Sequence, residues 1–286
     1  DFYGSIKTTY EEAKKIDPTI KYDDIKRYFE TTKVRKTNLR GYNSFIAHHF
    51  RDEYQIDLFF MNDNPDDEYK IGLLVIDIFS KFIEVIPLKT KQPKDLLDGL
   101  IEGMKNIGGK PKTIYSDDEG SLNSKLLQDY FKENDIRHLT TRGHAGVAER
   151  AIRTIKEMIY KRLEKHPDSH WYDVKILANA LVTYNFKNVS SATGYTPNDG
   201  RDKKNELNVR LNLELGRVTK RKYPEIEVND KVRIYCKRKN FEKGVRVLVW
   251  SEAIYTVEKI EDSMGQKMYF ASGRDRGLLR HEILKT

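Results

Sequence analysis

The order of strand-like and helix-like runs between residues 54 and 186 constrains the fold of this chain most strongly. Three apolar or β-branched runs come first, at 54–61, 71–79 and 82–88, with polar turns between them. Helical spacing follows at 95–107, 122–134, 147–165 and 171–186, and short strands end at Ser116 and Thr140. An antiparallel start followed by strand–helix alternation predicts an α/β fold, with a mixed sheet and helices packed on its faces.

The regions on either side of this pattern differ from it and from each other. Residues 1–45 predict a small helical region that ends in a basic connector, which either follows a DNA backbone or is a solvated linker. Residues 201–224 are polar and charged and predict a linker. Residues 225–286 hold several short strand-like runs separated by glycines, which predicts a small β-barrel. The catalytic unit would then span residues 46–200.

The basic charge of the chain is confined to its C-terminal part. Residues 1–200 contain 31 Lys and Arg against 31 Asp and Glu, whereas residues 201–286 contain 21 against 13. Such an excess suits either a module that faces a polyanion or simply a basic soluble domain. The single cysteine, Cys236, excludes an intramolecular disulfide framework and fits a reducing compartment. The most apolar stretch, 71–78, is too short to span a membrane, so no membrane partner is expected.

Three carboxylates are candidates for chemistry, although each also has an ordinary structural explanation. Asp57 interrupts an apolar run, where a carboxylate is costly unless it is paired, bound to a metal or directed out of a half-exposed strand. Asp117 follows a predicted strand, the place for a ligand-binding residue or for a turn or capping acid. Glu149 lies in the first turns of a basic helix, where the helix dipole favours an acid in any case.

Together, the three acids lie on two strands and at one helix start, which can meet at one edge of the sheet. Three carboxylates in one place repel unless cations offset their charge, and Mg²⁺ prefers oxygen ligands. Two Mg²⁺ (or Mn²⁺) ions, about 3.5–4 Å apart, support an in-line phosphoryl displacement without a nucleophilic side chain. Asp57, Asp117 and Glu149 are therefore candidate metal ligands, and the ordinary structural explanations stay open beside this one.

Five sequence blocks, in the same order, resemble the catalytic core of retroviral-type (DDE) integrases. They cover roughly residues 50–200: Tyr54–Asp57, Val75–Lys81, Ile114–Asp117, Gly146–Arg150 and Tyr184–Pro197. More narrowly, Thr140–Ala145 running into Glu149–Lys156 is similar to integrases of Maverick/Polinton transposons and virophages. Val228–Arg233 and Trp250–Glu252 resemble the SH3-like domain that follows such cores.

The resemblance implies a fold and an activity. The fold is a ribonuclease-H-like mixed-sheet core between a small N-terminal helical region and a C-terminal SH3-like, DNA-binding β-barrel. The activity is that of a polynucleotidyl transferase and DNA integrase with endonuclease activity, which processes the 3′ ends of element DNA and joins them to target DNA. It also implies a tetramer or larger homo-multimer on DNA, acting in the host nucleus, with carriage in a viral particle as an option. Transposon and virophage origins stay open.

The sequence departs from the family pattern in three places. Only 31 residues separate Asp117 from Glu149, Glu119-Gly120 replaces the usual Asn-Gly order, and His48-His49 has no cysteine partners for a zinc site. The resemblance implies that Asp57, Asp117 and Glu149 are the catalytic, metal-binding acids, and the matching block favours Asp117 over the adjacent Asp118 as the second acid. Asp77 matches a family position that is not a metal ligand, and we interpret it as an acid that stabilises the turn before Ser80.

Basic residues around the third acid are the predicted DNA contacts. They are Arg142, His144, Arg150, Arg153 and Lys156. Of these, Arg153 and Lys156 follow Glu149 by four and seven residues and share its helical face, whereas Arg150 points elsewhere. A metal-dependent nuclease that cuts without joining, and an inactive domesticated DNA-binding protein, are the alternative functions. The presence of all three acids argues against the second.

Overall fold

The structure, a computed structural model, describes residues 5–32, 46–61, 67–117, 120–141, 146–216, 224–236, 250–263 and 266–286. The basic connector 33–40 and most of the expected strand 245–250 lie outside these ranges. So do Asp118, Arg142 and His144. None of the helices in the described ranges is long and apolar enough to cross a membrane.

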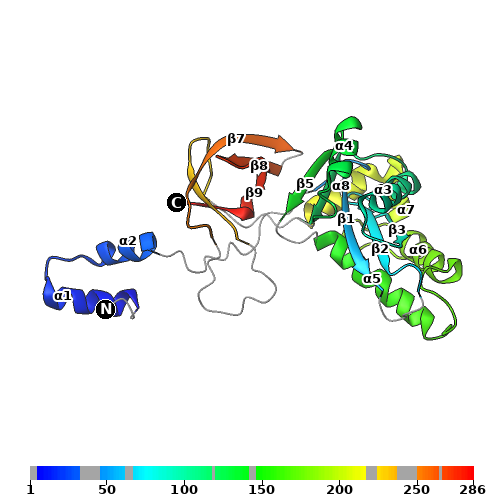
Figure 1. The fold of residues 1–286 in the computed structure, drawn as a ribbon, viewed down its shortest axis with the longest axis horizontal. Coiled ribbons are helices and arrows are strands. Elements are labelled where there is room, and N and C mark those ends of the chain that lie inside the picture. The colour runs from blue at the N-terminus through cyan, green and yellow to red at the C-terminus, as the bar shows by residue number, and fades with distance from the viewer. Residues whose placement is uncertain are drawn as a thin grey trace.

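A five-stranded mixed sheet forms the centre of the chain, in the order β3-β2-β1-β4-β5 (Figure 1). The antiparallel part consists of β1 (Glu53–Phe60), β2 (Ile71–Asp77) and β3 (Ile83–Leu88). The strands β4 (Thr113–Asp117) and β5 (Arg137–Thr141) run parallel to β1. This confirms the predicted mixed sheet. It also explains the unbroken apolar run in β2, because every residue of this strand is buried.

Helices cover both faces of this sheet, and each face has its own apolar core. On one face lie α3 (Pro93–Ile107) and α4 (Lys125–Glu133), with Leu100 and Leu127 fully buried. On the other face lie α5 (Gly146–Leu163) and α6 (Asn179–Val182). The helix predicted at 171–186 is present as α6 flanked by two π-helical turns, η1 (Val174–Ala178) and η2 (Thr183–Lys187).

The predicted N-terminal helices are present as a packed pair. They are α1 (Ile6–Ile16) and α2 (Tyr22–Thr32). Ser5 caps the start of α1 by accepting the Thr8 N–H at 3.2 Å. The Tyr10 and Tyr22 rings meet edge to face, with centroids 5.4 Å apart. The Asp17-Pro18 break predicted between them therefore lies at the turn.

The linker predicted over 201–224 needs correction, because its first half is structured. After the short helix α7 (Pro197–Gly200), the chain forms η3 (Lys203–Asn205) and α8 (Glu206–Leu215). Val209 of α8 is fully buried in the core on the α5 side of the sheet. The polar composition of this segment hides the helix, because only one face of α8 is buried. The helix also contacts a neighbouring turn, where Asn212 Nδ2 donates to the Thr193 carbonyl at 2.7 Å.

The C-terminal part forms a second, antiparallel sheet in the order β10-β6-β7-β8-β9. Its strands are β6 (Lys231–Ile234), β7 (Tyr255–Ser263), β8 (Gln266–Ala271), β9 (Leu278–Leu279) and β10 (Ile283–Lys285), with the single turn η4 (Arg280–Glu282) between the last two. Val232, Val257 and Ile283 form its core. Two further side chains, Met268 and Leu279, join the buried cluster of the central domain instead, so this unit packs against that domain. We call it the C-terminal barrel after the fold predicted from the sequence, although the structure shows it as a five-stranded sheet.

Candidate active site

The two predicted aspartates lie level with each other on neighbouring parallel strands. The register between β1 and β4 pairs Ile56 with Ser116, and Asp57 and Asp117 directly follow that pair. Parallel strands are about 4.8 Å apart, and residues at one level face the same side. The two carboxylates therefore leave the sheet side by side on one face. Both residues are partly buried, and Asp57 Oδ1 accepts the Leu58 N–H at 2.8 Å.

The start of α5 is fixed above this same face by Gln55. Gln55 precedes Asp57 by two residues, so both side chains lie on one side of β1. Its Oε1 accepts the backbone N–H groups of Val147 and Ala148, each at 3.2 Å, two of the four that a helix start leaves unpaired. Glu149 follows directly in the first turn of α5. The positive end of the helix dipole thus lies on the same face of the sheet as the aspartates.

The chemistry of this donor set fits Mg²⁺, which binds carboxylate oxygens. The sheet brings Asp57 and Asp117 together, and α5 brings Glu149 to the same edge. Within the described ranges, however, no three or more His, Cys, Asp or Glu side chains gather closely enough to hold a metal ion. A three-carboxylate site thus requires side chains to rearrange around the aspartate pair, and it stays a prediction.

A chain of hydrogen bonds supports the end of β4 from the opposite face. Gln128 Nε2 on α4 lies 2.8 Å from His138 Nδ1, and His138 Nε2 lies 2.9 Å from Ser116 Oγ. Ser116 Oγ in turn donates to the Asp117 carbonyl at 3.0 Å. Burial lowers the pKa of His138 to about 4, so the imidazole is neutral and has one donor and one acceptor nitrogen. Neither this support nor that of Gln55 was predicted from the sequence. A polar side chain within each short apolar strand is the sequence feature that could have indicated them.

Asp77 has the structural role that the sequence predicted. Its Oδ1 accepts the Ser80 N–H at 2.6 Å and the Ser80 hydroxyl at 2.7 Å, and its Oδ2 accepts the Arg51 N–H at 2.9 Å. These bonds hold the turn between β2 and β3, in which Lys81 adopts a φ of 68°. Burial raises the pKa of Asp77 to about 6, although the bonds from Ser80 oppose this rise.

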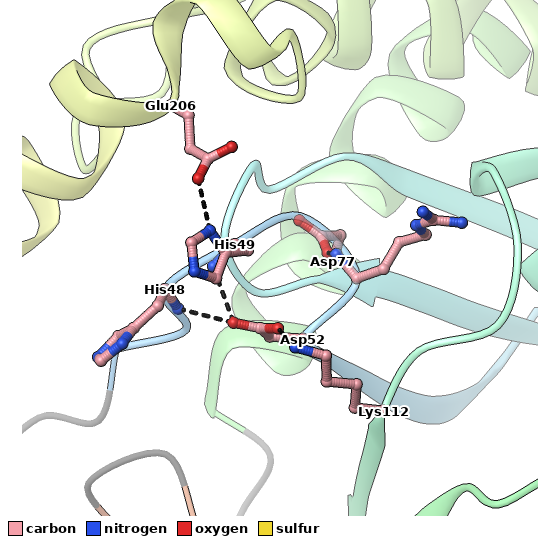
Figure 2. A network of polar contacts seen from close by, with 7 residues as sticks. His48, His49, Asp52, Asp77, Lys112 and Glu206 are labelled. Carbon is pink, nitrogen blue, oxygen red and sulfur yellow. Dashed lines mark hydrogen bonds and ion pairs between the residues drawn. The ribbon is translucent and has the colours of Figure 1, made fainter.

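The histidine pair joins α8 to the sheet rather than forming a zinc site. Figure 2 shows His49 directed at Glu206 of α8, with His49 Nδ1 and Glu206 Oε1 2.5 Å apart. The backbone N–H groups of His48 and His49 donate to Asp52 Oδ2, at 3.2 and 2.9 Å. Lys112 Nζ, 2.8 Å from Asp52 Oδ1, completes this network at the beginning of β4. This network could not be predicted from the sequence, because Glu206 lies in the segment interpreted as a linker.

The predicted DNA-contacting residues on α5 face different surroundings. Arg153 is exposed. Lys156 is partly buried, and its Nζ donates to the Phe60 carbonyl at the end of β1, at 2.8 Å. Arg150 lies close enough to Lys81 and Tyr184 for its charge to influence the pKa of both. Burial is the larger cause in each case: it lowers the pKa of Lys81 to about 8 and raises that of Tyr184 to about 12.

Comparison with curated sequences points to mobile elements, although no protein-family model matches the chain. A transposon-derived protein of Caenorhabditis elegans is 26% identical over 185 residues, which are 64% of this chain and 60% of that protein. The retrovirus-related Pol polyprotein from transposon 297 of Drosophila melanogaster is 28% identical over 151 residues, 52% of this chain and 13% of the polyprotein. The chain thus spans less than two thirds of the length of these relatives.

Comparison with solved structures extends over nearly the whole chain. A chain of the simian T-cell lymphotropic virus intasome, solved in complex with PP2A regulatory subunit B56 gamma, matches with a TM-score of 0.60 and 14% identity. The match covers 94% of this chain and 92% of that chain. The fold of this chain therefore resembles that of the intasome chain. The sequence relatives named above are a transposon-derived protein and a retrovirus-related polyprotein of a transposon.

Proposed function

We propose that this chain is the integrase of a mobile genetic element, which processes the 3′ ends of element DNA and inserts them into target DNA. One observation supports this most directly: Asp57 and Asp117 are level on neighbouring parallel strands, beside a helix start that carries Glu149. The two bonds from that helix start to Gln55, which precedes Asp57 by two residues, support a role for Glu149 beside the aspartates. The sequence relatives from transposons agree with this assignment.

In the proposed mechanism, Asp57, Asp117 and Glu149 would hold two Mg²⁺ (or Mn²⁺) ions. When bound, these ions would supply activation of the attacking oxygen and stabilisation of the leaving oxygen in an in-line displacement at phosphorus. During processing, a water oxygen bonds to phosphorus and the 3′ oxygen of the element DNA leaves as a hydroxyl. During joining, that hydroxyl attacks a target phosphodiester and releases a target 3′ oxygen. No side chain bonds covalently to DNA, and Arg153 offsets phosphate charge beside the acids.

We further propose that the C-terminal barrel is an SH3-like DNA-binding module. Its antiparallel order and the charge excess beyond residue 200 support this role. Deleting residues 225–286 is expected to weaken DNA binding and to flatten its salt dependence, by roughly 0.9 in the log–log slope per lost phosphate contact. Titrating labelled duplex DNA at several salt concentrations measures this slope, with the melting temperature of the truncated chain as a control. An unchanged slope would assign the barrel to protein contacts.

The origin, assembly and location of the protein belong to the same proposal. The motif Thr140–Ala145 running into Glu149 supports an origin in a Maverick/Polinton transposon or a virophage. We expect a tetramer or larger assembly on paired DNA ends, acting in the host nucleus or carried in a viral particle. Light scattering of the chain with and without duplex DNA tests the assembly, and a monomer in both conditions would contradict it.

A joining assay tests the activity itself. The full chain is incubated with labelled duplexes of randomised end sequence, supercoiled plasmid and Mg²⁺ or Mn²⁺, and the products are separated and sequenced. Label joined to plasmid is the expected result, and the junction sequences would reveal the preferred ends. Shortened label without joined product would favour the nuclease. Unchanged DNA together with retained DNA binding would favour the domesticated DNA-binding protein.

A further inference from the structure

The C-terminal barrel contacts the central sheet at its exposed edge strand, β5. Arg276, between β8 and β9, donates from Nη1 to the Thr140 carbonyl of β5 at 2.5 Å. A second contact joins the other end of the strand, where Arg137 Nη2 lies 2.7 Å from Glu261 Oε2 of β7. Among the strands of the described ranges, β5 pairs with β4 alone, and the barrel arginine contacts this edge strand.

Arg276 is held rigidly within the barrel. Its two Nη atoms donate to the two carboxylate oxygens of Glu282, at 3.2 and 2.9 Å. Glu282 is only 1% exposed and also accepts the Leu279 N–H at 2.9 Å. A bidentate arginine–carboxylate pair fixes the plane of the guanidinium group. The bond to Thr140 is therefore directed by a preformed group and not by a flexible surface side chain.

The interface around Arg276 is apolar at one place and hollow at another. Met268 and Leu279 of the barrel share a buried cluster with Leu139 of β5. Next to them is a cavity of about 530 Å³, whose lining includes His138, Thr140 and Arg276. Because side chains do not fill this space, the polar contacts at its border contribute to fixing the position of β5 against the barrel.

The register of β5 shows that the Arg276 contact lies next to the candidate active site. Thr140 pairs with Ser116 of β4, and Thr141 pairs with Asp117. The strand that Arg276 holds is thus the direct neighbour of the second predicted metal ligand. On the other side of Asp117, β4 pairs with β1, which carries Asp57. The side-by-side position of Asp57 and Asp117 therefore depends on three neighbouring strands, β1, β4 and β5, and the C-terminal barrel contacts the outermost of them.

We propose that Arg276 is a positioning residue, through which the C-terminal barrel sets the geometry of the Asp57–Asp117 pair from the β5 edge. This inference rests on the proposed function of that pair. It adds a coupling between the two domains. The contact between the barrel and β5, in addition to the catalytic acids, determines how well the site binds divalent cations.

The test compares Arg276→Met with Arg274→Met in the full chain. Arg274 is a matched control, because it lies in the same segment but contacts Tyr255 within the barrel, donating to its hydroxyl at 3.1 Å. Mn²⁺ binding is measured by calorimetry without DNA, and hydrogen exchange of β5 is measured alongside. We expect Arg276→Met to weaken Mn²⁺ binding roughly tenfold, as is typical when a group that orients metal ligands is lost. Exchange in β5 should become faster, while Arg274→Met should match the wild type.

Other outcomes separate this inference from the proposed function. If the wild type and Arg276→Met bind Mn²⁺ equally, Arg276 is not a positioning residue, and the proposed active site is unaffected. If the wild type and Asp57→Asn bind Mn²⁺ equally, the proposed site itself is wrong, and this inference fails with it. Should Arg276→Met unfold because Glu282 is left buried and charged, the double variant Arg276→Met/Glu282→Gln removes that charge and is measured instead.

Discussion

The central sheet carries two groups of acids, and the surroundings of the two groups differ. Glu53 and Asp77, at the start of β1 and the end of β2, are 3% and 0% exposed. Asp57 and Asp117, further along β1 and at the end of β4, are partly exposed beside the start of α5. A carboxylate in an apolar strand is therefore not informative alone. The donors around it decide whether it holds a turn or is available for chemistry.

Asp77 illustrates the structural group. Three donors from Ser80 and Arg51 converge on its carboxylate, and this arrangement accounts for its burial without any metal. The aspartate pair has a different setting, because two carboxylates at one level of the sheet repel and gain from a cation. We therefore expect aspartate to have two different roles within one sheet. Mutations of the two groups that had the same effects, or the reverse of those expected, would contradict this comparison.

The largest expected effect is the loss of activity when an acid of the second group is neutralised. Asp57→Asn, Asp117→Asn and Glu149→Gln should each reduce end processing and joining to background, because each removes a metal-binding charge at nearly constant volume. Folding and DNA binding should persist, as melting and gel-shift measurements would show. Near-normal activity in one variant would remove that residue from the site. If only Asp117→Asn stayed active, its role would pass to Asp118.

Asp77→Ala should have the opposite profile. Its loss leaves the Ser80 hydroxyl and two backbone N–H groups without their acceptor in a fully buried turn, at a cost of about 3 kcal/mol in the free energy of unfolding. Urea denaturation measures this loss. Joining by the fraction that remains folded at low temperature should match the wild type, with Asp77→Asn as a milder companion. Loss of joining without loss of stability would place Asp77 in the active site.

A smaller effect, visible only as a pH dependence, is expected from Glu53. Burial raises its pKa from 4.5 to about 8, so between these values the folded chain binds the proton more tightly than the unfolded chain. Its contribution to stability is therefore present at low pH and is lost as the pH rises toward 8. Glu53→Gln should flatten the fall in melting temperature, most clearly between pH 6 and 8, because the raised pKa of Asp77 extends only to about 6. Parallel curves for wild type and variant would contradict this assignment.

The strands and helices of the core could be predicted from the sequence, because each apolar run has one clear period. The continuous run in β2 and the spacing of Leu96, Leu100 and Met104 in α3 report burial directly. The two aspartates were found for the same reason, since each interrupts or ends such a run. Helix α8 was missed because Val209 is its only fully buried residue, so its apolar pattern is weak.

Contacts between distant segments could not be predicted in this way. The bonds from Gln55 to the start of α5, from His49 to Glu206 and from Arg276 to Thr140 join residues 92 or more positions apart. No periodicity encodes such pairs, because they depend on the register of the sheet and on how the barrel packs against it. The bonds from Gln55 lie beside the predicted aspartates, so the sequence predicts candidate acids but not the contacts around them.

The last and smallest contrast concerns the basic residues of α5, some of which lie near the buried acids and others near the predicted catalytic acids. Arg150 and Arg153 are both exposed, but Arg150 lies near Lys81 and Tyr184, on the side of the buried acids, whereas Arg153 follows Glu149 by one turn. Arg153→Glu should therefore reduce joining, by roughly tenfold, or about 1.4 kcal/mol, with an unchanged melting temperature, since it sets like charge against phosphate. Lys156→Glu should reduce joining and also lower the melting temperature, because Lys156 donates to the Phe60 carbonyl.

Arg150→Glu is the matched comparison and should affect joining least. Joining yields and melting temperatures of all three variants decide the matter: wild-type joining by both Arg153→Glu and Lys156→Glu would show that this face of α5 does not contact DNA.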